Sequence, residues 1–181
     1  MNTRTAMVII NIIGGLAVLG SYAWGLLGFP ETRGGIWGGI PESMKPFYTY
    51  SMLTAAAGYF LFTPFFLFRV DPQKLDQSGP FSFSIINWLY LLVLIPSALW
   101  LPLTFELLQA PSDFLWLLVR LVLAITALGS LGLLYAIVRL RSHAGAVGFW
   151  LALLGILAFN LQTTLLDALV WTSYFPYPNP M

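Results

Sequence analysis

The chain has 181 residues, of which 59% are hydrophobic and 8% are charged. Because a soluble domain carries about 25% charged residues, this composition predicts an integral membrane protein. The formal net charge of +1, with no cluster of Lys and Arg, argues against a nucleic-acid-binding protein. The chain has no cysteine, which excludes a disulfide, a thiolate nucleophile and a cysteine-ligated metal site.

Five apolar segments follow one another along the chain. Each is near or above the roughly 20 residues that a helix needs to cross about 30 Å of hydrocarbon. They cover approximately residues 6–29, 46–69, 84–108, 114–138 and 146–172. None shows the alternating pattern of a barrel strand. Since only helices and closed barrels pair all backbone N–H and C=O groups in lipid, these segments are predicted to be helices. We predict an all-α fold in which residues 1–181 form one five-helix transmembrane bundle.

The distribution of Lys and Arg predicts which side of the membrane is cytoplasmic. Five spans place the termini on opposite sides, and the side with the N-terminus carries five cations against two. The first group is Arg4, Arg69, Lys74, Arg139 and Arg141, and the second is Arg33 and Lys45. We therefore predict a multi-pass membrane protein with a cytoplasmic N-terminus and a C-terminus on the opposite face.

Glycines predict both a mobile connection and a close helix contact. In the connection 30–45, glycines on both sides of Ile36 and Trp37 indicate a pliable flap that carries an aromatic ring. In the first span, small residues recur at helical spacing, which predicts close packing because small side chains let two backbones approach. These residues are Gly14, Ala17, Ser21, Gly25 and Gly28.

The last span carries a polar stripe. Asn160, Thr164 and Asp167 follow at i, i+4 and i+7, so a regular α-helix places them along one side. Such a stripe faces the bundle interior or water.

On the fourth span, Arg120 is predicted to point inward, for which two interpretations stay open. One is an ion pair with Glu106 or Asp167, and the other is a polar mouth to a cavity.

The third span contains the stretch SALWLPLTFELL, with a tryptophan, a proline and a glutamate. Pro96 and Pro102 each remove a helical hydrogen bond, so we expect the helix to bend or open beside Trp100 and Phe105. The alternative is an ordinary kinked helix with an interfacial tryptophan. If the helix opens, Trp100 and Asn160 should face one cavity, with Glu106 near its outer mouth.

Residues of this stretch match a known signature. The pattern is Asn-x-x-Trp-x-Pro-x-Phe-Phe, and four of its positions are occupied here by Ser97, Trp100, Pro102 and Phe105. The chain thus resembles the translocator protein, or tryptophan-rich sensory protein, family of small five-helix membrane proteins. Ser97 replaces the asparagine of the signature and Thr104 replaces one phenylalanine.

Two further motifs extend the resemblance over nearly the entire chain. The first loop of the family carries a tryptophan followed by Lys-Pro, as Trp37 precedes Lys45-Pro46 here. Its last helix begins after Ala-Gly and carries a tryptophan and then an asparagine. The counterparts in this chain are Ala144-Gly145, Trp150 and Asn160. The second span lacks the tryptophans and the proline pair of the family.

The resemblance implies a protein that binds, transports or senses a flat hydrophobic molecule such as a porphyrin or a sterol, without a covalent bond to it. Aromatic side chains would form the walls of the site and polar ones would orient the ligand. The residues predicted to bind ligand are Trp37, Ser97, Trp100, Phe105, Trp150, Asn160 and Thr164.

Two other functions stay open. The first is an auxiliary or structural subunit of a larger membrane complex, whose second span offers outward aromatic residues to partners; a homodimer is the other assembly that stays open. Those residues are Phe62, Phe65, Phe66 and Phe68. The second is a membrane-embedded enzyme that modifies a lipid, with Asp167, Glu106 and Arg120 moving protons. We predict no catalytic set and no metal site, since the single histidine, His143, lies in a connection.

Overall fold

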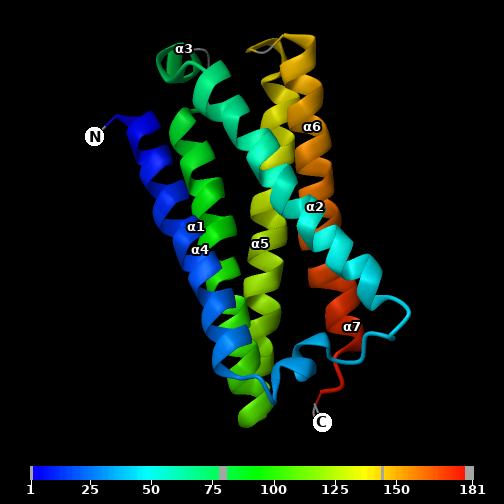
Figure 1. Ribbon diagram of the computed structural model, residues 1–181. Helices are drawn as coiled ribbons and strands as arrows, with labels where there is room; N and C mark the ends of the chain where they lie inside the picture. The colour runs from blue at the N-terminus through cyan, green and yellow to red at the C-terminus, as the bar shows by residue number, and fades with distance from the viewer. Residues whose placement is uncertain (1, 78–80, 144, 178–181) are drawn as a thin grey trace.

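The protein is described from a computed structural model that covers residues 2–77, 81–143 and 145–177. The described residues form helices and no strand. Five helices of the described residues are long and apolar enough to cross a membrane, and Figure 1 shows how they are arranged. They run Thr3–Gly28, Lys45–Arg69, Phe83–Gln109, Asp113–Arg139 and Ala146–Tyr174. The predicted all-α five-helix bundle is confirmed, and each helix begins and ends within three residues of its predicted range.

The described residues form eleven helical elements. In chain order the main elements are α1 (Thr3–Gly28), η1 (Arg33–Trp37), α2 (Lys45–Pro64), η2 (Phe65–Arg69), α3 (Pro72–Gln77), α4 (Phe83–Gln109), α5 (Asp113–Arg139), α6 (Ala146–Asn160), η4 (Leu161–Trp171) and α7 (Thr172–Tyr174). A short 3₁₀-helix, η3 (Arg141–His143), links α5 to α6. We call the two ends of the bundle the α3 end and the α7 end (Figure 1).

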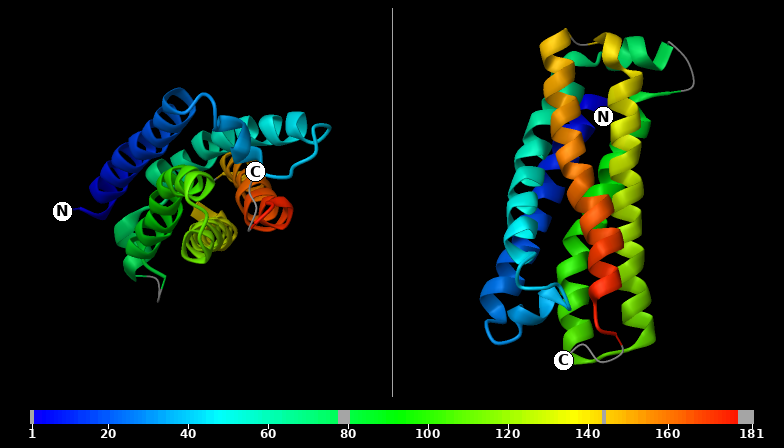
Figure 2. Two further views of the ribbon diagram at one scale, coloured as in Figure 1. Left: turned by 90° about the horizontal axis from the view of Figure 1, so that it is seen from below. Right: turned by 90° about the vertical axis from the view of Figure 1, so that its right-hand side faces the viewer.

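The helices do not pack in the order of the sequence. The main contacts are α1 with α4, α4 with α5, α5 with α6, and α6 with α2. Helices α1 and α2 approach each other toward the α3 end, where Tyr59 donates a hydrogen bond to Asn11 Oδ1, and they diverge toward the α7 end (Figures 1 and 2). The short connection after α4 makes α4 and α5 antiparallel neighbours, as short loops between helices do.

Glycines set the closest helix contacts. A Cβ atom at Gly14 would lie 2.7 Å from Leu94 Cδ1, and one at Gly25 would lie 2.6 Å from Phe105 Cε2, so both positions pack directly on α4. Gly28, in contrast, has nothing within 4 Å of such an atom. On the other side of the bundle, a Cβ at Gly58 would lie 2.4 Å from the Gly155 carbonyl. Small residues therefore join α1 to α4 and α2 to α6.

Buried side chains form two clusters, one in each half of the bundle. The cluster toward the α3 end includes Phe62, Phe66, Phe83 and Tyr90. The cluster toward the α7 end includes Tyr48, Leu107, Leu166 and Trp171. The predicted outward aromatic surface on the second span is wrong for three of its four residues. Phe62, Phe65 and Phe66 are buried, and only Phe68 is exposed, at 76%.

Helix α4 stays α-helical through both of its prolines. The predicted opening at Pro96 and Pro102 is therefore wrong. Each proline lacks one N–H group, while packing against α1 and α5 on two sides holds the helix along its length. Two hydroxyl groups bond to the helix itself: Ser97 Oγ donates to the Val93 carbonyl at 2.6 Å, and Thr104 Oγ1 donates to the Trp100 carbonyl at 2.8 Å.

Two spans change their helical pattern instead. The second becomes a π-helix at Phe65–Arg69, directly after Pro64, and the fifth is a π-helix over the eleven residues Leu161–Trp171. A π-helix bonds each residue to the one five positions away and is frequent at functional sites. In η4, side chains five residues apart therefore lie on the same side of the helix. The predicted alignment of Asn160, Thr164 and Asp167 assumed a regular α-helix and did not include this spacing.

Candidate functional site

Aromatic rings from several elements meet near the α7 end. We call this group the aromatic cluster, and it comprises Tyr22, Trp100, Trp116, Trp171, Phe175 and Tyr177. Trp100 lies between Tyr22 and Trp171, with ring centroids 6.2 Å and 5.7 Å away. Trp116 stacks on Phe175 at 5.2 Å. The rings come from α1, α4, α5, η4 and the segment after α7, so tertiary packing alone brings them together.

Trp100 has a polar atom that the protein leaves without a partner. Its indole Nε1 is buried and makes no hydrogen bond with any described residue. A buried N–H group without an acceptor costs free energy, and indole N–H groups usually find one when buried. The predicted inward position of Trp100 agrees with these contacts, and its N–H remains available to an acceptor.

Residues 29–44 cover this end of the bundle. Trp171 Nε1 donates to the Ile36 carbonyl at 2.8 Å, and the Gly39 N–H donates to the Tyr174 carbonyl at 3.1 Å. Trp37 is half-buried and meets Tyr48 edge-on, with ring centroids 6.5 Å apart. The predicted pliable flap is therefore held to the last helix by backbone and indole hydrogen bonds.

Asp167 is the central polar residue of the region. Its Oδ1 accepts a hydrogen bond of 2.7 Å from Gln162 Nε2. Tyr48 on α2 donates a hydrogen bond of 3.0 Å to the carbonyl of the neighbouring Leu166, so a phenol lies close to this part of the last span. Gln162 Oε1 is buried without a partner among the described residues. A carboxylate, an unpaired amide oxygen and an unpaired indole N–H thus lie in one aromatic half of the bundle.

The prediction that Arg120 points inward is wrong, and with it both interpretations, the ion pair and the polar mouth to a cavity. Arg120 is exposed, and its guanidinium lies 5.9 Å from the ring centre of Trp116, one turn toward the α7 end. This is the geometry of a long side chain that reaches toward the membrane surface along an aromatic face. Glu106 is exposed as well. Within the described residues the ion pair found is between Lys45 and Glu42, so Asp167 has no cation partner there.

Asn160 belongs to a separate hydrogen-bond network between α5 and the last span. Its Nδ2 donates to the carbonyls of Ser130 and Ile156 at 3.1 Å and 3.0 Å. Its Oδ1 accepts from Ser130 Oγ at 3.0 Å and from Thr164 Oγ1 at 3.2 Å. The network fixes two helices to each other, since interhelical polar bonds favour association in lipid. Asn160 and Thr164 are thereby engaged with protein atoms.

The structure disperses the other predicted ligand residues. Phe105 is fully buried and stacks on Phe29 at 5.0 Å, between α1 and α4. Ser97 bonds within its own helix. Trp150 is 58% exposed near the α3 end. Trp37 and Trp100 pack against the buried cluster in the half of the bundle that holds Asp167, whereas Trp150 is on the outer surface near the other end.

Searches of protein-family models, of curated proteins and of solved structures give no match. The resemblance to the translocator protein family therefore stays a prediction. Of its motif residues, Ala144 lies outside the described residues. No group of three or more His, Asp or Glu residues that could hold a metal ion occurs in the described part of the chain.

Sequence reasoning missed several residues of this region, namely Tyr22, Tyr48, Trp116 and Gln162. Gln162 gave no signal, because on a regular α-helix a residue five positions before Asp167 points to a different side. The sequence did carry a signal for Trp116, because it lies four residues before Arg120 and the two side chains can stack on one side of a helix. Tyr22 and Tyr48 lie on spans without a clear polar side.

Proposed function

We propose that this multi-pass membrane protein binds a flat hydrophobic molecule, of the size of a porphyrin or a sterol, between its helices near the α7 end. The observation that carries the proposal is Asp167, a half-buried carboxylate without a cation partner among the described residues, placed beside the aromatic cluster. Ligand sites are lined mainly by aromatic and apolar side chains with a few converging polar groups. This combination favours a ring system with one polar edge.

The polar edge of the ligand meets both kinds of hydrogen-bonding group. Asp167 and the unpaired Gln162 Oε1 accept hydrogen bonds, and Trp100 Nε1 donates one. A sterol hydroxyl satisfies an acceptor and a donor at once, and a pyrrole N–H satisfies a carboxylate. Trp37, on the segment that covers this end, packs against Tyr48 and closes the site toward water.

The orientation in the membrane is part of the proposal. We place the α3 end in the cytoplasm, because Arg4, Arg69, Lys74, Arg139 and Arg141 all belong to that side. The ligand site then lies in the half of the membrane away from the cytoplasm. Cysteine accessibility tests this placement: in a chain without natural cysteine, Ser142→Cys should react with membrane-impermeant reagents only from the cytoplasmic side, and Ser43→Cys only from the other.

A titration tests the binding itself. Purified protein in lipid nanodiscs is titrated with protoporphyrin, haem and cholesterol, while tryptophan fluorescence and, for the tetrapyrroles, ligand absorbance are recorded. We expect saturable binding of at least one of the three. Trp100→Ala should weaken it by about 1–3 kcal/mol, the scale of one large aromatic contact, and Trp150→Ala serves as the matched control on the outer surface.

Three outcomes contradict the proposal. One is the absence of saturable binding for all three molecules. Another is an equal loss of affinity in the Trp100 and Trp150 variants. The third is a Trp100→Ala protein that fails to fold while the ligand affinity of a refolded sample is unchanged, which would make Trp100 a packing residue. The subunit and enzyme alternatives gain no support, since Phe62, Phe65 and Phe66 are buried and Arg120 points outward.

A further inference from the structure

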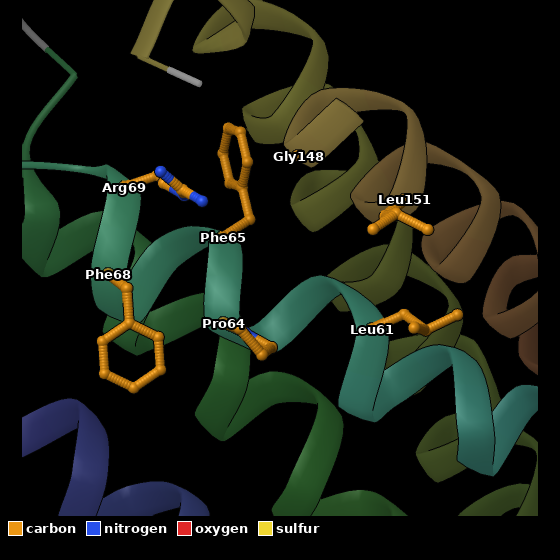
Figure 3. A pocket seen from close by; sticks show the side chains of 7 residues that line it. All are labelled: Leu61, Pro64, Phe65, Phe68, Arg69, Gly148 and Leu151. Carbon is orange, nitrogen blue, oxygen red and sulfur yellow. The ribbon is translucent and has the colours of Figure 1, made fainter. Parts of the chain in front are cut away.

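A groove lies on the outer surface between the second and fifth spans, at the α3 end. Figure 3 shows it from close by. It is half open, has a volume of about 330 Å³ and is lined by Leu61, Pro64, Phe65, Phe68, Arg69, Gly148 and Leu151. This place is at the opposite end of the bundle from the aromatic cluster, so its function is independent of the ligand site proposed above.

Backbone features shape the groove. Pro64 ends the regular hydrogen bonding of α2, and the π-helix η2 begins at the next residue. On α6, Gly148 presents no side chain toward the groove. Phe65 is buried and forms the inner wall, whereas Leu61 and Leu151, both 46% exposed, form its sides. The result is an apolar slot that opens sideways, in the direction where a bilayer surrounds the helices.

Arg69 adds one positive charge to this apolar slot. It is exposed and is the last residue of the second span, so it lies at the depth of lipid headgroups. Figure 3 shows its guanidinium on the same side of the helix as Phe65, with Phe68 pointing the other way. Arg69 has no hydrogen bond or ion pair with any described residue. Nearby Arg4, by contrast, donates to the Val70 carbonyl at 2.9 Å.

No acidic residue in the described part of the chain forms an ion pair with Arg69. Asp71 and Asp76 follow Arg69 in the chain, and one carboxylate oxygen of each already accepts a backbone N–H, from Gln73 at 3.0 Å and from Phe83 at 2.8 Å. Both carboxylates thus hold the short helix α3 and its connection to α4. The charge that the groove offers to a ligand is that of the free guanidinium.

We propose that the groove binds an anionic glycerophospholipid, with one acyl chain along Leu61, Phe65 and Leu151 and the phosphate bonded to Arg69. A guanidinium matches a phosphate with two parallel hydrogen bonds. Basic pockets between membrane helices on the cytoplasmic side are typical sites for anionic headgroups. The volume is near the lower end of the range for small-molecule sites, about 300–1,000 Å³, which suits a single chain better than a ring system.

Native mass spectrometry of delipidated protein tests the site. Dioleoyl phosphatidylglycerol and dioleoyl phosphatidylcholine have the same chains and differ in net charge. We expect tighter binding of the anionic lipid to the wild type. Arg69→Gln should reduce this preference roughly fivefold, the effect of about one basic residue at a membrane surface. Arg139→Gln is the matched control, because Arg139 is an exposed last-turn arginine of α5 outside the groove.

A second comparison separates the contribution of the acyl chain to binding from that of the headgroup. Dihexanoyl phosphatidylglycerol carries the same phosphate with short chains, and it should bind more weakly than the dioleoyl form if the groove holds an acyl chain. Equal binding of the two, or full competition by inorganic phosphate, would show a headgroup contact only and overturn the proposal. Equal losses in the Arg69 and Arg139 variants would overturn it as well, by indicating a diffuse charge effect. Circular dichroism confirms that each variant is folded before lipid is added.

Discussion

Gln162 donates a hydrogen bond of 2.7 Å to the carboxylate of Asp167, five residues later on the same helix. Residues at this spacing meet because Leu161–Trp171 is a π-helix. The amide is the hydrogen-bond donor that the described residues supply to this carboxylate. The bond thus connects an unusual backbone conformation to a half-buried carboxylate in the half of the bundle near the α7 end.

Gln162→Leu should destabilise the protein by about 1–3 kcal/mol, the cost of leaving a buried polar group unsatisfied. Thermal unfolding in detergent, followed by tryptophan fluorescence, measures the effect. Gln109→Leu is the control, since Gln109 is an exposed residue at the end of α4. Double substitution with Asp167→Leu should recover part of the loss, because no unpaired carboxylate then remains. An unchanged unfolding temperature for Gln162→Leu would show that this hydrogen bond does not stabilise the folded protein.

Asn160→Leu should destabilise the contact between α5 and the last span. The substitution removes two donated and two accepted hydrogen bonds, and interhelical bonds of this kind contribute about 0.6 kcal/mol on average. A loss of about 1–2 kcal/mol is therefore expected in the same unfolding measurement. Ser97→Ala, which removes a bond within α4 alone, should cost less. A larger loss for Ser97→Ala would contradict the assignment of Asn160 as the interhelical residue.

Gly25→Leu and Gly28→Leu form a matched pair on α1. A Cβ atom at Gly25 would come within 2.6 Å of Phe105 and 2.7 Å of Leu101, whereas Gly28 has open space. Overcrowding of a packed contact costs typically about 1–3 kcal/mol. We expect Gly25→Leu to lower the unfolding temperature and Gly28→Leu to leave it nearly unchanged. Similar effects at the two positions would show that α1 does not pack on α4 as described.

Tyr177 should titrate above the usual range of a tyrosine. Its phenol donates a hydrogen bond to Asp113, and this bond to the carboxylate raises the pKa of Tyr177. Because the folded pKa is the higher one, the contact stabilises the folded C-terminal segment below the usual tyrosine pKa. The contribution is lost as the pH rises through the raised value.

Ultraviolet absorbance of tyrosinate measures this titration, and subtraction of the Tyr177→Phe spectrum isolates Tyr177. Asp113→Asn removes the charge and should bring the pKa of Tyr177 down toward its usual value. Glu106→Gln, which changes an exposed carboxylate elsewhere on the same face of the membrane, should leave it unchanged. A Tyr177 pKa that is the same in wild type and Asp113→Asn would exclude the hydrogen bond in solution.

The amino-acid sequence alone determined the number of spans, their limits and the close contact at Gly14 and Gly25. The thickness of the hydrocarbon fixes how many apolar residues a helix needs, and charged or turn-forming residues mark where each one ends. Small residues at helical spacing permit a close approach whatever the partner is. These features depend on the composition of each segment and need no knowledge of its neighbours.

The tertiary structure decided which side of each helix faces inward. In water, a helix buries its apolar side, and the sequence shows that side as a periodic pattern. In lipid the outer surface is as apolar as the core, so the pattern is weak. Trp100 and Trp150 are both tryptophans within spans, yet one lies in the aromatic cluster and the other on the outer surface. The pairing of Gln162 with Asp167 depends in addition on the π-helix, in the part of the last span that packs against α5 and α2.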